Sequence, residues 1–436
     1  MKKWMIMALL AAVLTGCQRY EAAPEHGAEA EIGTGIETGM ESGTGIEHTE
    51  EPGAESKEES AEEDQSGSPD GNPQIYITQE TGDPAAERTP VKVKGIYVSA
   101  YVAGTEAMMD EIIRQIDETE LNAVVIDVKD DNGRITFDMD SPTVKEINAA
   151  KDYIPDMEAL AARLKEHDIY MIARIPAFRD PYLAEAKPEW CCKRKDGSIF
   201  RDRNKLAWVN PYKKEVWDYL IEVAKKAGEL GFDEIQFDYI RFCTEKGMGN
   251  VVFDEADTLG RDRQDIILEF VEYAYEELAK EGLFVSADVF GAVIGGGTDA
   301  ELVGQDYGEM AGVLDYICPM IYPSHYGDGN FGIAHPDTEP YQTIYAALGG
   351  SKRDLEGYLA SASLASREAK AAVVRPWLQD FTASYLKHHI KYGPEQVRAQ
   401  IQAVYDAGYE EWILWSAAVK YHYDGLLPAE AESRTE

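Results

Sequence analysis

The sequence has few of the residues that bind metals and nucleic acids. Its 436 residues include five cysteines and eight histidines, and no two cysteines have the CxxC spacing of a zinc site. Lys and Arg number 42 against 80 Asp and Glu, so there is no basic footprint to neutralise the phosphates of a nucleic acid. No HxH pair occurs, and only His325 falls near a predicted strand end. We therefore expect no nucleic-acid partner, no cofactor and no catalytic metal, although an acidic loop is suited to a structural Ca²⁺.

Two catalytic motifs are also missing. A Walker-type or dinucleotide-type glycine-rich loop is absent, and no GxSxG sequence marks a nucleophilic serine. These absences exclude the common classes of phosphate-binding enzyme and serine hydrolase.

The N-terminus contains an apolar run that is too short to cross a bilayer. Trp4–Val13 spans about ten residues, whereas a membrane helix needs about 20. The run leads into Leu14-Thr15-Gly16-Cys17, which resembles a bacterial lipobox. We interpret residues 1–16 as a lipoprotein signal peptide and Cys17 as the lipidated residue, which would anchor the chain to the cell membrane on its extracytoplasmic side. The alternative is an ordinary secretory signal that happens to contain a cysteine.

The next segment is predicted to be a disordered acidic linker. Residues 17–90 are rich in Gly, Glu, Ser and Thr and have too little apolar content to offset the entropy of ordering. Repulsion between the acidic side chains favours an extended tether, which next to an anionic envelope would hold the domain away from the surface. The alternative is an inert spacer of arbitrary sequence.

Residues 91–428 are predicted to form a (β/α)8 TIM barrel, followed by a tail over residues 429–436. Short apolar segments alternate with amphipathic stretches, a pattern typical of parallel strands connected by helices. Eight such segments are the number that closes a barrel. An open doubly wound sheet is the alternative, but no glycine-rich turn follows the first segment. The predicted strands are Val93–Ala100, Ala123–Lys129, Tyr170–Ala177, Glu234–Phe242, Phe284–Gly291, Tyr316–Pro323, Val373–Phe381 and Glu411–Ala417.

Polar residues interrupt these segments near their carboxyl ends, where TIM barrels carry their active sites. Since side chains alternate between the two faces of a strand, the apolar set should face the helices and the polar set the barrel interior. This places Asp127, Lys129, Arg174, Asp238 and Asp288 inward. Because burying unpaired charge costs several kcal/mol per ion, we expect a wet, functional cleft there.

One run of residues resembles a known family. Gly231-Phe-Asp-Glu-Ile-Gln-Phe-Asp-Tyr-Ile-Arg-Phe242 is similar to the strand-four signature of bacterial glycoside hydrolases with an FDYIRFP-type motif. The resemblance extends to Trp208-Val-Asn210-Pro211 and Met320-Ile-Tyr322-Pro323. It implies a TIM barrel, often secreted or lipid-anchored, that is distantly similar to the α-amylase-like clan.

The clan resemblance also implies roles for three carboxylates. Asp238 matches the nucleophile, Asp288 the acid/base residue and Asp380 the stabilising carboxylate. The sequence departs from the clan pattern in having Asp rather than Glu at position 288, and in three further residues: Gln236 instead of Arg, Gln379 instead of His, and Cys243 instead of the family's Pro.

The residues themselves suit glycoside hydrolysis, which needs one ionised and one protonated carboxyl group. Asp238, with Arg174 or Arg241 nearby, suits the ionised nucleophile, and Asp288, beside apolar residues, suits the acid. Each Asp has a structural alternative. For Asp127 and Arg174 this is an ion pair, and for Asp380 it is a helix cap.

The substrate-binding residues should include aromatic platforms, of which Tyr322 and Trp377 are the best candidates. The segment 178–211 is too long for an ordinary loop and is expected to wall one side of the cleft. The full predicted set of substrate-binding residues is Asp127, Lys129, Arg174, Trp208, Asn210, Gln236, Tyr239, Arg241, Tyr322, His325, Trp377 and Gln379.

These patterns favour a retaining glycoside hydrolase that acts on an extracellular or cell-envelope polysaccharide. The alternative is a surface lipoprotein that binds glycans on the same scaffold without cleaving them.

Overall fold

The structure, a computed structural model, describes residues 88–364 and 369–429. The predicted signal peptide, the lipidation site at Cys17 and almost all of the predicted linker lie outside the described residues, so these remain predictions.

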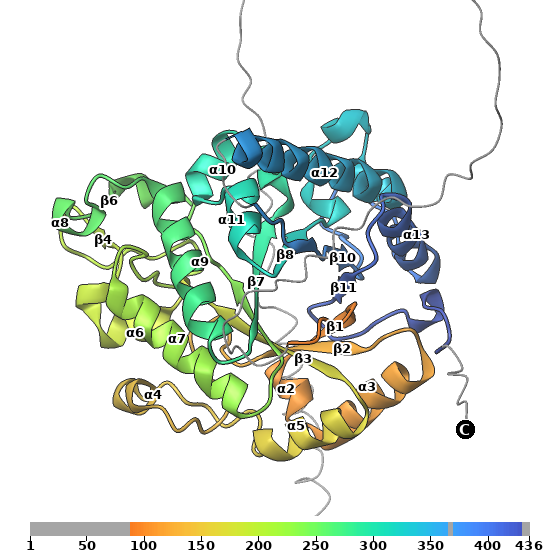
Figure 1. The fold of residues 1–436 in the computed structure, drawn as a ribbon, viewed down its shortest axis with the longest axis horizontal. Coiled ribbons are helices and arrows are strands. Elements are labelled where there is room, and N and C mark those ends of the chain that lie inside the picture. Colours follow the sequence, from red (N-terminus) through yellow and green to blue (C-terminus); the bar gives the residue numbers. More distant parts are fainter. Residues whose placement is uncertain (1–87, 365–368, 430–436) are drawn as a thin grey trace, which may run out of the picture. The chain divides into compact units, whose positions relative to one another are not determined.

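A closed barrel of parallel strands confirms the predicted (β/α)8 fold (Figure 1). The last strand pairs with the first, and β10 pairs with both β8 and β11, which closes the sheet. Two short strands, β9 and β10, together occupy the seventh strand position of the barrel. The nine strand segments therefore fill eight positions. The barrel strands are β1 (Lys94–Val98), β2 (Ala123–Asp127), β3 (Tyr170–Pro176), β5 (Glu234–Asp238), β7 (Phe284–Phe290), β8 (Tyr316–Met320), β9 (Val373–Val374), β10 (Trp377–Gln379) and β11 (Trp412–Trp415).

Helices in the connections surround the strands (Figure 1). Their apolar faces pack against the outward side chains of the barrel, as when Phe270 contacts Phe237 with ring centroids 5.3 Å apart. The helices are α2 (Ala100–Ala103), α3 (Glu106–Glu118), α4 (Pro142–Ile147), α5 (Met157–Glu166), α6 (Pro181–Ala186), α7 (Lys214–Glu229), α8 (Glu255–Thr258), α9 (Arg263–Ala279), α10 (Thr298–Val303), α11 (Tyr307–Val313), α12 (Pro340–Leu364) and α13 (Pro394–Asp406).

The predicted alternation of side chains on β5 and β7 is confirmed. Ile235 and Phe237 belong to the large apolar core between strands and helices. A second, smaller apolar cluster fills the barrel interior and includes Tyr97, Val125 and Trp377. The charged residues of β5 therefore point into the barrel from the other face of the strand.

All eight predicted strands end before their predicted last residue, and two of them show why. The strand from Glu234 stops at Asp238, because Tyr239 has a left-handed backbone with φ of 47° and its N–H bonds the Asp238 carboxylate instead of a neighbouring strand. The strand from Val373 is divided at Pro376, which has no N–H to donate to a ladder.

The long segment after β3 pairs with the connection that follows β5. Strand β4 (Lys193–Arg194) pairs antiparallel with β6 (Val251–Val252), so these two loops form one small sheet beyond the carboxyl ends of the barrel strands. That residues 178–211 wall one side of the cleft stays a prediction.

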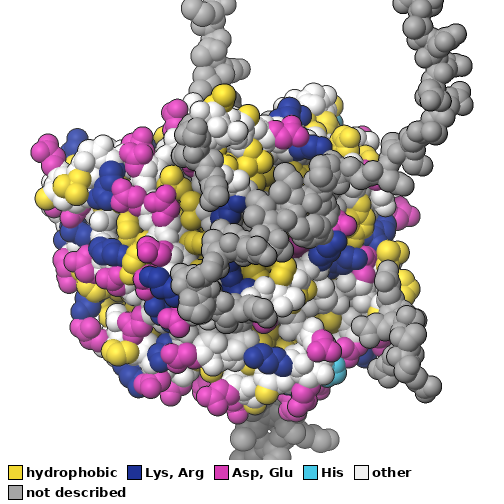
Figure 2. All heavy atoms as spheres, in the orientation of Figure 1, with side chains coloured by type: hydrophobic (Ala, Val, Ile, Leu, Met, Phe, Trp, Pro, Cys, Tyr) yellow, Lys and Arg dark blue, Asp and Glu magenta, His cyan; other side chains and the backbone are white. Residues whose placement is uncertain are grey.

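Three further observations bear on the predictions. The four cysteines of the described residues, Cys191, Cys192, Cys243 and Cys318, are all free and buried. Among the described helices, none combines the length and apolar character of a bilayer span. On the face in Figure 2, acidic and basic side chains are intermixed wherever the described residues are visible.

Candidate active site

The central feature of the site is a buried guanidinium. Arg174, inward on β3, donates from Nε to Asp238 Oδ2 at 2.9 Å and from Nη1 to Asp127 Oδ1 at 2.7 Å. Its Nη2 also binds Asp238 and Asp131, the latter at 2.9 Å. The parallel register places Asp127, Arg174 and Gln236 side by side, which is why residues far apart in the sequence meet here. The structure thus brings together three of the predicted site residues, Asp127, Arg174 and Asp238.

A second guanidinium extends this cluster toward the loops. Arg179, just beyond β3, binds Asp131 at 2.8 Å and lies over the Tyr239 ring, 3.6 Å from its centroid. The two arginines hold the pKa of Asp131 below its usual value. The Asp131 side chain is 35% exposed, so the cluster reaches solvent on this side.

Asp288 has a different environment. Its Oδ1 accepts a 2.6 Å hydrogen bond from the indole Nε1–H of Trp377, which crosses the barrel interior from β10. Burial raises the pKa of Asp288 well above its usual range, and the neighbouring charge of Asp238 raises it further. The hydrogen bond from Trp377 and the more distant Arg174 oppose this rise without cancelling it. Burial and the charge of Asp238 therefore favour the protonated form of Asp288.

The two carboxyl groups occupy matching positions on adjacent strands. The β5–β7 register pairs Phe237 with Ala287, and both Asp238 and Asp288 follow one residue later. Since neighbouring strands lie about 4.8 Å apart, the two side chains enter the barrel side by side. A carboxyl group bound by a guanidinium and a carboxyl group with a raised pKa thus lie on neighbouring strands at the carboxyl end of the sheet.

Asp127 is a third titratable group in the cluster. Burial raises its pKa to about 6, although Arg174 and a hydrogen bond from Tyr97 both lower it. The Tyr97 hydroxyl donates to Asp127 Oδ2 at 2.5 Å, and the Tyr97 ring packs on Trp415 with centroids 4.4 Å apart.

Trp208, Asn210 and Arg241 shape the wall beside the carboxylates. Arg241 lies against the rings of Trp208, Tyr239 and Phe290, at 5.2, 5.3 and 4.4 Å from their centroids. Trp208 donates its indole N–H to Asp202 at 3.1 Å. Asn210 accepts from the backbone of Tyr212 and so fixes the end of the long loop. Trp208 and Asn210 order the loop through these contacts. Arg241 and Tyr239 connect the loop to the mouth of the barrel.

A cavity of about 520 Å³ opens at the ends of β7 and β8. Phe290, Met320, Tyr322, His325 and Tyr326 are among its lining residues. Phe290 follows Asp288 by two residues on β7, but neither Asp288 nor Asp238 is among the lining residues of the cavity. Its volume is in the range of ligand-binding sites. The predicted binding residues Tyr322 and His325 belong to this cavity.

Several predicted residues lie elsewhere. Lys129 pairs with Asp180 at 2.6 Å and lies over the Tyr219 ring of α7, so it belongs to the outer layer of the barrel. Gln379 binds Asp337 and the backbone of Ser324. Both oxygens of Asp380 are engaged by His422, one by its Nδ1 and one by its backbone N–H. These contacts favour structural roles for the three residues.

Two predicted residues lie inside the barrel. Gln236 is fully buried and donates to Cys318 Sγ at 3.4 Å. Trp377 is 1% exposed, which corrects its predicted role as an open stacking platform: its ring fills the interior and its N–H reaches Asp288.

The sequence reasoning missed Asp131 and Trp415. Asp131 follows a run of two other acidic or basic residues after β2, and nothing in that pattern distinguishes it from its neighbours. Trp415 is at the carboxyl end of the last strand, and that position alone marks it as a site candidate.

A (β/α)8 barrel with a pair of carboxyl groups at its strand ends is the arrangement of many enzymes that hydrolyse glycosidic bonds. The family described as "Putative glycosyl hydrolase domain" matches residues 95–421, and the chain belongs to this family. Membership indicates a glycosidase with a carbohydrate substrate.

Solved structures give further similarities. A hypothetical protein from Ruminiclostridium thermocellum is 38% identical with a TM-score of 0.41, over 44% of this chain and 97% of that one. The PgaB (BpsB) glycoside hydrolase domain from Bordetella bronchiseptica is 12% identical with a TM-score of 0.49, over 75% and 94%. The spore cortex-lytic enzyme SleL from Bacillus megaterium is 13% identical with a TM-score of 0.44, over 77% and 74%. No curated protein matches the chain.

Proposed function

We propose that the chain is a retaining glycoside hydrolase with Asp238 as the nucleophile and Asp288 as the general acid/base. One observation carries the proposal: two adjacent carboxyl groups have opposite environments, since Arg174 binds Asp238 whereas Asp288 is buried with a raised pKa. When the surroundings of two neighbouring carboxyl groups favour different protonation states, the group whose protonated form is favoured is assigned as the acid and the other as the nucleophile.

In the proposed reaction Asp288 donates its proton to the glycosidic oxygen while Asp238 attacks the anomeric carbon. The bond to the leaving group breaks and a covalent glycosyl-enzyme forms. A water molecule then gives a proton to Asp288 and displaces Asp238 from the sugar, which restores both groups. Arg174 holds Asp238 in place throughout.

The experiment compares Asp238→Asn and Asp288→Asn in a polysaccharide-digestion screen that includes aryl glycosides. Asp238→Asn should lower kcat/KM by at least about 10³-fold on every active substrate, because a neutral amide is a much poorer nucleophile than a carboxylate. Asp288→Asn should lose much less on substrates with an activated leaving group, whose departure needs no proton. NMR of the first product should show the anomer of the substrate.

Other outcomes would change the proposal. A product of inverted anomer would make Asp238 a general base instead of a nucleophile. Glycan binding without sugar release, unchanged in Asp238→Asn, would support the alternative of a binding lipoprotein.

We further propose that the enzyme acts on extracellular or cell-envelope polysaccharide while held at the membrane by a lipid on Cys17. The lipobox-like sequence and the acidic linker support this location. The test is metabolic labelling with a fatty acid: wild type should carry the label in the membrane fraction, and Cys17→Ser should not. Label that persists in Cys17→Ser would refute lipidation at this residue.

A further inference from the structure

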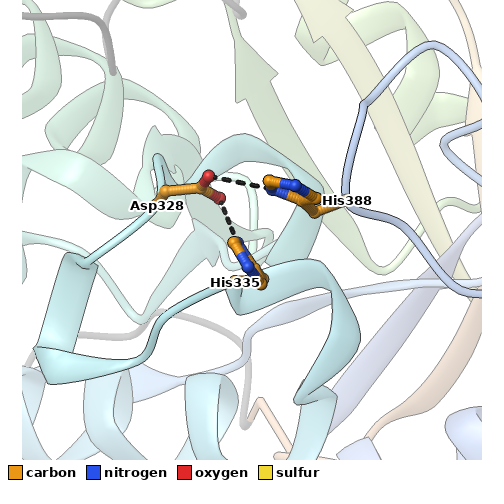
Figure 3. Close-up of side chains that lie close together, drawn as sticks. All are labelled: Asp328, His335 and His388. Atoms are coloured by element: carbon orange, nitrogen blue, oxygen red, sulfur yellow. Dashed lines mark hydrogen bonds and ion pairs between the residues drawn. The ribbon is translucent and has the colours of Figure 1, made fainter.

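Two loops at the carboxyl end of the barrel bring two histidines and an aspartate together (Figure 3). Asp328 and His335 lie between β8 and α12, and His388 lies between β10 and α13. Both imidazoles point toward the one carboxylate (Figure 3). This cluster, which we call the His–Asp cluster, is separate from the carboxyl groups proposed for catalysis.

The geometry of the His–Asp cluster is close to that of a coordination sphere. Asp328 Oδ1 is 3.0 Å from His335 Nδ1, and Oδ2 is 3.1 Å from His388 Nδ1. The candidate ligand atoms all lie within 4.8 Å of one another. Zinc bonds of about 2.0–2.1 Å in a tetrahedron separate neighbouring ligand atoms by about 3.3 Å. The separations in the cluster are therefore compatible with one ion bound between the three residues.

Ordinary ion pairing explains this arrangement poorly. The two imidazole rings have centroids 3.8 Å apart, and a single carboxylate can neutralise only one imidazolium. In addition, His335 Nδ1 is a buried atom that makes no hydrogen bond of acceptable direction within the described part of the chain. A cation that accepts lone pairs from both rings would remove both problems.

The loops that carry the histidines are fixed to each other close by. Two residues beyond His335, Asp337 accepts from Gln379 at 3.0 Å and from the backbone of Ile390 at 3.4 Å. Ile390 is itself two residues beyond His388. The Tyr392 hydroxyl also donates to the Asp337 carbonyl at 3.2 Å. The pairing of the histidines is therefore built into the packing of the two loops, as a metal site requires.

We propose that Asp328, His335 and His388 bind a divalent transition-metal ion of the zinc class. Two imidazoles and a carboxylate suit such an ion, whereas Ca²⁺ and Mg²⁺ prefer oxygen ligands alone. Three protein ligands leave a coordination position for water.

The ion would stabilise one wall of the cavity. Phe331, three residues beyond Asp328, packs against Tyr326 with ring centroids 5.0 Å apart, and both rings line the cavity. By joining the loop of Asp328 to the loop of His388, the ion would hold this wall in one position.

The test is titration of the full chain with Zn²⁺ by calorimetry after treatment with EDTA. Wild type should bind one ion per chain at the cluster. Since loss of an outer-shell partner typically costs 10–100-fold in affinity, His335→Ala and His388→Ala should each cost at least about 100-fold. Zn²⁺ should raise the Tm of wild type but not of these variants.

Two other histidines provide matched controls. His389→Ala changes the next residue, whose Nδ1 contacts the Leu386 carbonyl, and His167→Ala breaks an exposed pair with Asp117. Both should keep wild-type affinity for Zn²⁺. The side chains of His335 and His388 are 38% and 35% exposed, so alanine there should leave the fold intact, and circular dichroism checks this. Where an alanine variant misfolds, His388→Gln replaces it.

Three results would overturn the proposal: no saturable uptake of Zn²⁺, uptake that survives both His→Ala substitutions, or tighter binding of Ca²⁺ than of Zn²⁺.

Discussion

The two ends of the barrel each contain a buried arginine, but in opposite settings. At the amino end Arg375 binds Glu234 at 2.9 Å and Glu411 at 2.8 Å, and the three side chains are 0–7% exposed. At the carboxyl end Arg174 binds three carboxylates, one of which, Asp131, is 35% exposed. The amino-end cluster is sealed, whereas the carboxyl-end cluster has a path to solvent.

For function, the two clusters differ more in how their charges are paired than in how exposed they are. At the amino end both carboxylates contact the arginine directly, and Ser286 and Tyr170 add hydrogen bonds to Glu234. At the carboxyl end Asp288 is bound by an indole N–H rather than by a cation, and its pKa is raised. Burial raises the pKa of Glu234 as well, so the difference between the ends is that Asp288 lacks a bound cation. An acid without a cation is suited to proton transfer, whereas a network whose acids are all paired is suited to holding the strands together.

The largest expected effect comes from the same substitution at the two ends. Arg375→Met leaves Glu234 and Glu411 buried without their cation, and should lower the free energy of unfolding by about 3–5 kcal/mol. Arg174→Met should lower stability less, because Arg179 remains and Asp131 can be hydrated. It should instead lower kcat/KM by about 10²–10³-fold, since Asp238 loses its positioning group. Urea unfolding and initial rates measure the two quantities.

The control for both is Arg114→Met on the exposed face of α3, where the arginine pairs with Glu111 and Glu118 in water. It should change neither stability nor rate appreciably. Equal losses of stability for Arg174→Met and Arg375→Met would remove the distinction between the two ends.

The next effect concerns the pH dependence of stability. The pKa of Asp288 is raised in the folded chain, so between its ordinary pKa and the raised one the folded state holds a proton that the unfolded state has released. Stability therefore falls as pH rises through this interval. Asp288→Asn removes that loss, so its Tm relative to wild type should be higher at pH 8 than near pH 4.

The matched control is Asp152→Asn, which changes an exposed carboxyl group. Its Tm difference from wild type should be the same at both pH values. A Tm difference for Asp288→Asn that is constant from pH 4 to 8 would contradict the assignment of a protonated Asp288.

Much of the fold was predictable because strand periodicity is a local property. The buried, β-branched runs at Ala123 and Phe284 identify their strands without any knowledge of neighbours. Two errors came from the backbone: a left-handed residue that no sequence pattern signals, and a proline inside a predicted strand that the sequence does show. The left-handed conformation of Tyr239 ends β5, and Pro376 divides the seventh barrel strand into β9 and β10.

The site was predictable only in part, because it depends on contacts between strands. Alternation placed Arg174, Asp238 and Asp288 inward, and Arg174 was already a candidate partner of Asp238. The partner of Asp288, the indole of Trp377, comes from across the barrel, and no spacing in the sequence connects the two. The pairing of His335 with His388 likewise depends on how two loops fold against each other.

A smaller effect is expected from Tyr97→Phe, which tests how the carboxyl-end cluster is tuned. The Tyr97 hydroxyl donates to Asp127 and stabilises its ionised form, so its removal should raise the pKa of Asp127 above about 6. A hydrogen bond worth about 1 kcal/mol corresponds to roughly half to one pH unit. The acidic limb of the kcat/KM profile should move up by this amount if Asp127 must be ionised to hold Arg174. An unchanged limb would show that Asp127 does not control the rate.

The smallest effect is expected at Asp380, the third carboxylate that the clan resemblance implies. His422 binds both of its oxygens, and burial raises the pKa of Asp380 while His422 lowers it. Because this carboxylate is already committed to a neighbouring loop, Asp380→Asn should lower kcat/KM by at most about threefold. His422→Gln should have a similarly small effect, and the two variants combined should be no worse than either alone, since they break the same contact. A loss as large as that of Asp238→Asn would place Asp380 in the reaction, and would extend the functional end of the barrel beyond the cluster around Arg174.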